Sequence, residues 1–128
     1  MIGRRQVLLL LVALTTGCAT TDSLEPGSGT SFQVKGRSYD QVWKAAVTTA
    51  SRSLTIVEQS RETGTIKAES RAGLATLGEV VGIFIRPARA GASAYTVEVQ
   101  SQKRSKLQIT GQDWTQTMVA GIKAELGQ

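Results

Sequence analysis

The stretch EVVGIFIR, residues 79–86, is the most strand-like segment of this 128-residue chain. It is dense in β-branched and aromatic side chains, which are enriched in strands, and Pro87 ends it because proline cannot donate to a strand ladder. Beyond a loop at residues 88–93, residues 95–100 alternate apolar and polar side chains. That alternation predicts a second strand with one face in solvent, paired with the first as a hairpin.

Further strands are predicted on both sides of this hairpin, because short apolar runs there are bounded by turn residues. Arg61 to Gly64 reads as a tight turn, since glycine adopts the positive φ that such a turn requires. Residues 71–77 show no clear period, and residues 102–106 read as a charged turn. The additional strands are expected at residues 32–35, 56–60, 65–70 and 107–110.

Two amphipathic helices are predicted, one between the strands at residues 32–35 and 56–60 and one after the strand at residues 107–110. Ser38 or Asp40 can cap the first, and Asp113 the second, which Gly127 is placed to end. Their apolar positions recur at helical spacing: Tyr39, Val42, Trp43, Ala46, Val47, Ala50 and Leu54 in the first, then Trp114, Met118, Ile122 and Leu126.

This order predicts an α+β fold in which an antiparallel sheet of about five or six strands carries both helices on one face, arranged β-α-β-β-β-β-β-α. Trp43 and Trp114 lie on the apolar sides of the helices, so we expect them in the core, meeting where both helices cross the sheet. The alternative is that an exposed tryptophan ring forms a platform for a sugar or a lipid.

The amino terminus carries an export signal. Arg4 and Arg5 precede a short apolar run, and small residues then lead to Gly17 and Cys18. The run is too short to span a membrane and ends in a processing motif. It is similar to the lipobox of bacterial lipoproteins, although that motif usually has leucine where Thr15 stands.

That resemblance implies three parts: a signal peptide at residues 1–17, a lipidated Cys18 followed by a flexible linker to residue 31, and a single periplasmic domain at residues 32–126. Two or three acyl chains on the cysteine, palmitate among them, would hold the protein on a membrane. Ala19 resembles the sorting position of such proteins, where aspartate favours the inner membrane, so the outer membrane is expected.

The composition argues against enzyme catalysis and against metal binding. The chain has 15 basic and 10 acidic residues, one cysteine and no histidine. Without histidine it lacks the commonest general base and metal ligand, and once Cys18 is lipidated no thiolate remains. We therefore expect no enzyme activity, no cofactor and no metal. The basic residues are spread along the chain, which is not typical of nucleic-acid binding.

Several motifs resemble a family of small, uncharacterised proteobacterial lipoproteins. They are residues 39–45 (YDQVWKA), 62–68 (ETGTIKA), 78–82 (GEVVG) and 109–114 (ITGQDW). The order of elements is similar to the helix-grip-like domains of the outer-membrane assembly lipoprotein BamC. The resemblance implies a fold and a compartment, and it brings no catalytic residues.

Two surfaces are candidates for binding. If the helices cover one face of the strand at 79–86, then Val80, Gly82 and Phe84 form an apolar stripe on the other face, available to a partner unless Leu74 and Leu77 cover it. Lys103, Arg104 and Lys106 are the densest basic cluster. They read either as a solvated turn or as a contact with an anionic surface.

The sequence thus favours a membrane-anchored periplasmic lipoprotein that binds another envelope protein through the outer sheet face or a sheet edge. The alternative is a module that binds a small ligand or a lipid in the groove between sheet and helices. The identity of the partner and the oligomeric state are left open.

Overall fold

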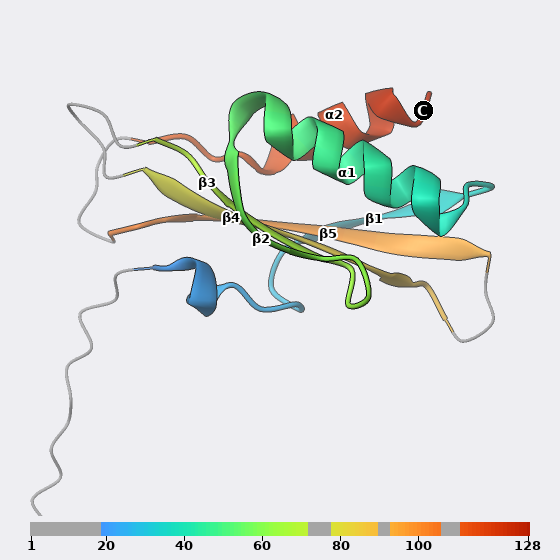
Figure 1. The fold of residues 1–128 in the computed structure, drawn as a ribbon, viewed down its shortest axis with the longest axis horizontal. Helices are drawn as coiled ribbons and strands as arrows, with labels where there is room; N and C mark the ends of the chain where they lie inside the picture. Colours follow the sequence, from blue (N-terminus) through green and yellow to red (C-terminus); the bar gives the residue numbers. More distant parts are fainter. Residues whose placement is uncertain (1–18, 72–77, 90–92, 106–110) are drawn as a thin grey trace, which may run out of the picture.

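Five antiparallel strands in the order β1-β5-β4-β3-β2 form one sheet, and both helices lie along one of its faces in the computed structural model (Figure 1). The structure describes residues 19–71, 78–89, 93–105 and 111–128. The elements are η1 (Thr21–Ser23), β1 (Thr30–Lys35), α1 (Tyr39–Ser53), β2 (Thr55–Ser60), β3 (Thr65–Glu69), β4 (Glu79–Pro87), β5 (Ala94–Lys103) and α2 (Thr115–Glu125).

The predicted α+β architecture is confirmed, with five strands in the described residues. The stretch at residues 79–86 is the central strand, because β4 pairs with β3 on one side and β5 on the other. In the β4–β5 register, Glu79 faces Lys103 at one end of the sheet and Pro87 faces Tyr95 at the other. β5 continues to residue 103, into the predicted turn, and the strand predicted at 107–110 lies outside the described residues.

α1 begins where its cap was predicted. Ser38 Oγ accepts from the Gln41 backbone N–H at 3.2 Å, and Gln41 Oε1 accepts from the Ser38 backbone N–H at 2.8 Å. This reciprocal capping box satisfies two of the N–H groups that a helix start leaves without partners.

α2 follows Asp113, whose Oδ1 accepts from the Thr115 backbone N–H at 2.9 Å. Gly127 ends the helix with a φ of 71°, a value that side chains disfavour. Gly121 lies against α1, because a Cβ there would come within 2.5 Å of Thr49 Cγ2. A glycine at this position therefore lets the two helices pack closely.

The main core fills the space between the helices and the sheet. From the sheet it takes the inward residues of β3, β4 and β5, and from the helices it takes the predicted apolar positions. Trp43 and Trp114 are partly buried against it, in agreement with the prediction that they are core residues. The expected meeting of the two tryptophans is wrong, because they lie toward opposite ends of the sheet. Trp43 stacks near Tyr39, which contacts Tyr95, whereas the backbone N–H of Trp114 donates to Ser101 Oγ.

Candidate functional site

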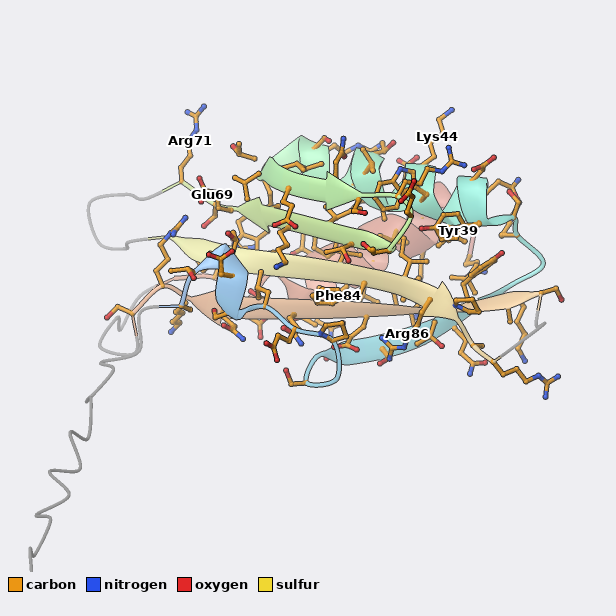
Figure 2. The ribbon with its side chains drawn as sticks, turned by 60° about the horizontal axis from the view of Figure 1, so that its bottom comes forward. Tyr39, Lys44, Glu69, Arg71, Phe84 and Arg86 are labelled. Atoms are coloured by element: carbon orange, nitrogen blue, oxygen red, sulfur yellow. The ribbon has the colours of Figure 1, made fainter. Side chains whose placement is uncertain are left out.

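The outer sheet face, turned away from the helices, is covered by the chain's own amino-terminal segment. We call residues 19–29 the strap; in Figure 2 this blue segment crosses in front of the sheet beside Phe84. Leu24 of the strap is 2% exposed and packs on Val80 and Phe84, which are 0% and 4% exposed. The prediction that Val80, Gly82 and Phe84 form an exposed partner surface is therefore wrong.

The cover was expected from a different segment. Leu74 and Leu77, the residues considered for it, lie outside the described residues. Leu24 performs this role instead, and its Cβ lies 3.4 Å from the point where a Cβ on Gly82 would stand. A Cβ on Gly82 would also come within 2.9 Å of the Phe84 ring, so the small size of Gly82 makes room chiefly for that ring, on which Leu24 packs.

Polar side chains of β5 hold the strap in place. Both carboxylate oxygens of Glu98 accept from the Gly27 backbone N–H, at 3.0 and 2.8 Å, and one also accepts from the Gly29 backbone N–H at 3.0 Å. Gln100 Nε2 donates to Ser28 Oγ at 2.9 Å and to the Glu25 carbonyl. Glu98 and Gln100 are 1% and 4% exposed, so the predicted solvent-exposed face of this strand is wrong at both positions.

Glu98 is ionised in this setting. Burial raises its pKa, but hydrogen bonds from the Gly27 and Gly29 backbones, Arg86 and Gln100 outweigh that effect and leave the pKa below its ordinary value of 4.5. Arg86 Nη1 lies 3.1 Å from Glu98 Oε1, and its side chain is 46% exposed. A carboxylate that accepts several N–H bonds is favoured in its charged form. The carboxylate is therefore the charged centre of the strap contact.

A close approach to β5 explains Gly29 of the strap, and a positive φ explains Gly27. A Cβ at Gly29 would lie 2.4 Å from the Val99 carbonyl oxygen, and Gly27 has a φ of 116°. Such positions favour glycine because it has no Cβ. The composition that suggested a flexible linker thus fits a tightly packed segment.

The flexible linker predicted for residues 18–31 is wrong for residues 19–31. Residues 19–29 form the strap, and β1 begins at Thr30. The folded domain therefore begins at Ala19 rather than at residue 32, directly after Cys18 in the sequence.

At one end of the sheet, the start of the strap is bonded to Arg104, which follows Lys103 in the sequence. The Ala19 backbone N–H donates to the Arg104 carbonyl at 2.8 Å. The Arg104 guanidinium pairs with Glu69, and Lys103 beside it is exposed. Lys106, the third member of the predicted basic cluster, lies outside the described residues.

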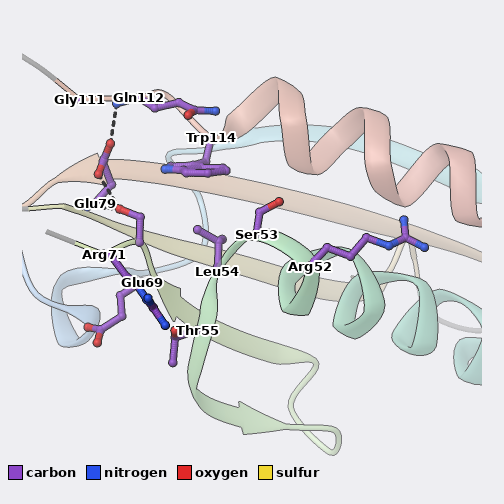
Figure 3. A pocket seen from close by; sticks show the side chains of 11 residues that line it. Arg52, Ser53, Leu54, Thr55, Glu69, Arg71, Glu79, Gly111, Gln112 and Trp114 are labelled. Carbon is purple, nitrogen blue, oxygen red and sulfur yellow. Dashed lines mark hydrogen bonds between the residues drawn. The ribbon is translucent and has the colours of Figure 1, made fainter. Parts of the chain in front are cut away.

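A pocket of about 560 Å³ opens at this same end, on the helix side of the sheet (Figure 3). We call it the proximal pocket; its lining includes Arg52, Leu54, Glu69, Arg71, Glu79 and Trp114. Glu79 is 3% exposed and accepts from the Ser70 hydroxyl at 2.6 Å and from the Gln112 backbone N–H. The Trp114 indole N–H is buried and has no hydrogen-bond partner within the described part of the chain.

A second depression, the distal cleft, lies at the opposite end of the sheet. It encloses about 710 Å³, and its lining includes Tyr39, Arg61, Thr63, Arg86, Pro87 and Tyr95. The rings of Tyr39 and Tyr95 are 5.6 Å apart and tilted by 55°. Burial raises the pKa of Tyr39, which keeps its hydroxyl protonated to donate to the Arg61 carbonyl at 2.5 Å.

Comparison with known proteins gives no further guide to chemistry. No protein-family model matches the chain, and a search of curated proteins also finds no match. Within the described ranges, no group of three or more His, Cys, Asp or Glu side chains is placed to hold a metal ion. None of the helices in those ranges has the length and apolar character needed to cross a membrane.

Proposed function

We propose that this chain is a lipoprotein anchored in the outer membrane through Cys18, and that its periplasmic domain binds another envelope protein without transforming a substrate. The observation that carries the proposal is the course of the strap. It begins at the residue after Cys18 and is bonded to one end of the sheet, while the distal cleft opens at the other end.

This arrangement would present the distal cleft to the periplasm. Arg104, which holds Ala19, follows directly after β5, and Tyr95 lies at the start of that strand. β5 has 10 residues, which corresponds to ~30 Å at the usual rise of a strand. With a lipid attached at Cys18, the distal cleft would therefore lie ~30 Å from the anchored end of the sheet.

The lining of the cleft suits a protein partner. Tyrosine and arginine are enriched among residues that dominate binding energy at protein interfaces, because they combine apolar area with polar groups. The cleft offers Tyr39 and Tyr95 with Arg61 and Arg86. The free edge at β2 is less suited to pairing with a partner strand, since its register shifts between Ile56 and Glu58 and such irregularities protect edges.

Cys18→Ser tests the anchor. We expect the variant to leave the membrane fraction or to accumulate as an unprocessed precursor, because serine cannot form the thioether to the diacylglyceryl group. Membrane fractionation and mass spectrometry of the mature amino terminus measure both outcomes. Unchanged fractionation and processing would contradict lipidation.

Photocrosslinking in cells tests the partner. A photoreactive residue at Thr63, which lines the distal cleft and is exposed, should form an adduct with a defined envelope protein. The same probe at Gln116, exposed on α2, should not. Arg61→Glu should remove the Thr63 adduct by reversing a charge at the rim, and Arg89→Glu, a charge reversal outside the cleft lining, should retain it. Equal adducts from both probe positions would contradict a role for the cleft.

Binding of a small ligand or a lipid is the second candidate function, and the proximal pocket favours it. The proximal pocket is lined in part by Trp114, whose buried indole N–H has no hydrogen-bond partner among the described residues, and a ligand that displaces the groups over this ring could accept that hydrogen bond. Native mass spectrometry of the protein purified from cells tests this candidate. A co-purified small molecule that is lost in Trp114→Phe would support it.

A further inference from the structure

The proximal pocket is lined by two opposite charges that are not paired. Glu79 is 3% exposed, and its carboxylate accepts from the Ser70 hydroxyl and the Gln112 backbone N–H, but no cation pairs with it among the described residues. Buried charges in proteins are normally paired with an opposite charge. Arg71 is exposed at the same pocket and also belongs to no ion pair within the described ranges.

The other charged side chains of the described lining are already paired. Arg52 pairs with Glu125, and Glu69 pairs with Arg104. Asp113 lies outside the lining, and its carboxylate accepts from the first turn of α2. The charges left in the lining are therefore one carboxylate and one guanidinium. A ligand that matches both must carry a cation and an anion, since a ligand with a single charge leaves one of them unpaired.

We propose that the proximal pocket binds a small zwitterion, whose ammonium group pairs with Glu79 and whose acid group pairs with Arg71. The inference rests on ligand binding in this pocket, the second candidate function, and adds the chemical class of the ligand. An α-amino acid and the phosphoethanolamine headgroup of a lipid share this chemistry, because each joins an ammonium group to a carboxylate or a phosphate.

Glu79 can accept an ammonium group without losing its present hydrogen bonds. An ionised carboxylate offers about four lone-pair sites, and the Ser70 hydroxyl occupies one on Oε2 while the Gln112 N–H occupies one on Oε1. Each oxygen therefore keeps a free site. The Trp114 ring lines the same pocket, and the negative face of an indole attracts cations. Both features favour an ammonium group over a neutral donor.

Arg71 suits the acid group of such a ligand. A guanidinium donates two parallel hydrogen bonds to a carboxylate or a phosphate, and these charge-assisted bonds are roughly twice as strong as neutral ones. In Figure 3 the Arg71 side chain extends toward Thr55 and away from the Glu79 carboxylate. The two charges thus border the pocket without neutralising each other, which leaves space for a ligand between them.

Titration with matched probes tests the two charges separately. O-phosphoethanolamine has both charges, ethanolamine has only the ammonium group, and ethyl phosphate has only the acid group. The sample is the isotope-labelled chain from Cys18 to Gln128, which contains every described residue. In NMR spectra the indole N–H signal of Trp114 reports on the pocket. That of Trp43, which stacks with Tyr39 at the distal cleft, is the internal control.

We expect O-phosphoethanolamine to shift the Trp114 signal saturably, with a Kd about tenfold below that of either single-charge probe. Glycine distinguishes the two sources, because tighter binding of glycine indicates an amino acid and weaker binding indicates a headgroup. No saturable shift with either zwitterion, equal affinities for O-phosphoethanolamine and ethanolamine, or equal shifts of both tryptophans would overturn the proposal.

Substitutions assign each charge to its residue. Arg71→Gln should weaken binding of O-phosphoethanolamine about tenfold and leave binding of ethanolamine unchanged, whereas Glu79→Gln should weaken both. Arg71 is exposed, so its variant tests the proposal even if the substitution at buried Glu79 unfolds the domain. Arg89→Gln, an exposed position outside the lining, should change neither affinity. Unchanged binding of O-phosphoethanolamine in Arg71→Gln would contradict the assignment.

The failure of this inference can be told apart from failure of ligand binding itself. A molecule that co-purifies, is lost in Trp114→Phe and carries no ammonium group would retain ligand binding and refute the zwitterion. If no molecule co-purifies but O-phosphoethanolamine binds as expected, the second candidate function loses its support and the zwitterion site stands.

Discussion

Glu98→Ala is expected to lower the free energy of unfolding by about 2–3 kcal/mol and to release the strap from the sheet. The substitution removes the acceptor for the Gly27 and Gly29 backbone N–H groups and the partner of Arg86. Gly29 is partly buried, so its N–H would lose the carboxylate acceptor without full access to water, whereas the N–H of exposed Gly27 can be rehydrated. Because Arg86 is 46% exposed and can return to water, the loss of stability is expected to be smaller than for a fully buried ion pair.

Urea unfolding measures this loss, and Glu58→Ala is the matched control. Glu58 is also a strand glutamate paired with a cation, Lys67, but its side chain is 54% exposed. Its removal should change stability by less than about 0.5 kcal/mol. Equal effects of the two substitutions would show that the buried carboxylate does not hold the strap.

The same carboxylate makes stability depend on pH in a definite direction. Its pKa is lowered on folding, so the unfolded chain binds its proton at higher pH than the folded one. The contribution of Glu98 is therefore fully present above pH 4.5 and is lost as the pH falls through the lower, folded-state pKa. Urea unfolding at a series of pH values should show a steeper acid loss in the wild type than in Glu98→Gln. Parallel curves would contradict this role.

Leu24→Ala is the second large effect, with an expected loss of about 2–4 kcal/mol. Leu24 is 2% exposed and is the strap's main apolar contact with Val80 and Phe84. Truncation leaves a cavity between strap and sheet, or exposes Phe84 if the strap lifts. An increase in binding of an apolar dye would distinguish the second case.

Val57→Ala is the control for this truncation, because Val57 is a large apolar side chain that is 47% exposed. Its loss should cost less than about 0.5 kcal/mol. A Leu24→Ala protein as stable as Val57→Ala would mean that the outer sheet face does not depend on the strap.

The architecture could be predicted because its signals are local. The helix at residues 39–53 has apolar residues at helical spacing and a cap at Ser38, and the turn before β3 has a glycine with a φ of 69° at Gly64. The stretch at residues 79–86 also indicates cover on both sides of the sheet, since its apolar residues lie on both faces.

The strap could not be predicted in the same way. Leu24 is the only large apolar residue between Cys18 and Phe32, so the segment has no period that indicates packing. Its partner Glu98 is 71 residues from Gly27 in the chain, and a charged residue on an alternating strand predicts a solvent-exposed face. One signal was present in the sequence: an apolar stripe at Val80 and Phe84 that needed a cover.

The docked strap changes what the proposed lipoprotein can do. A domain on a flexible linker would sample many orientations, whereas a domain bonded to its own anchor segment would present the end that holds Ala19 to the membrane and the distal cleft away from it. Recognition of a partner would then occur at a fixed height and orientation, which reduces the entropy lost on binding.

Hydrogen exchange of the Gly27 and Gly29 backbone amides tests the docked strap most directly. Both N–H groups donate to Glu98 beneath the strap, so they should exchange as slowly as amides in the edge strands of the sheet. Exchange of both amides at the rate of an unstructured peptide would contradict the docked strap and restore a flexible linker between Cys18 and the domain.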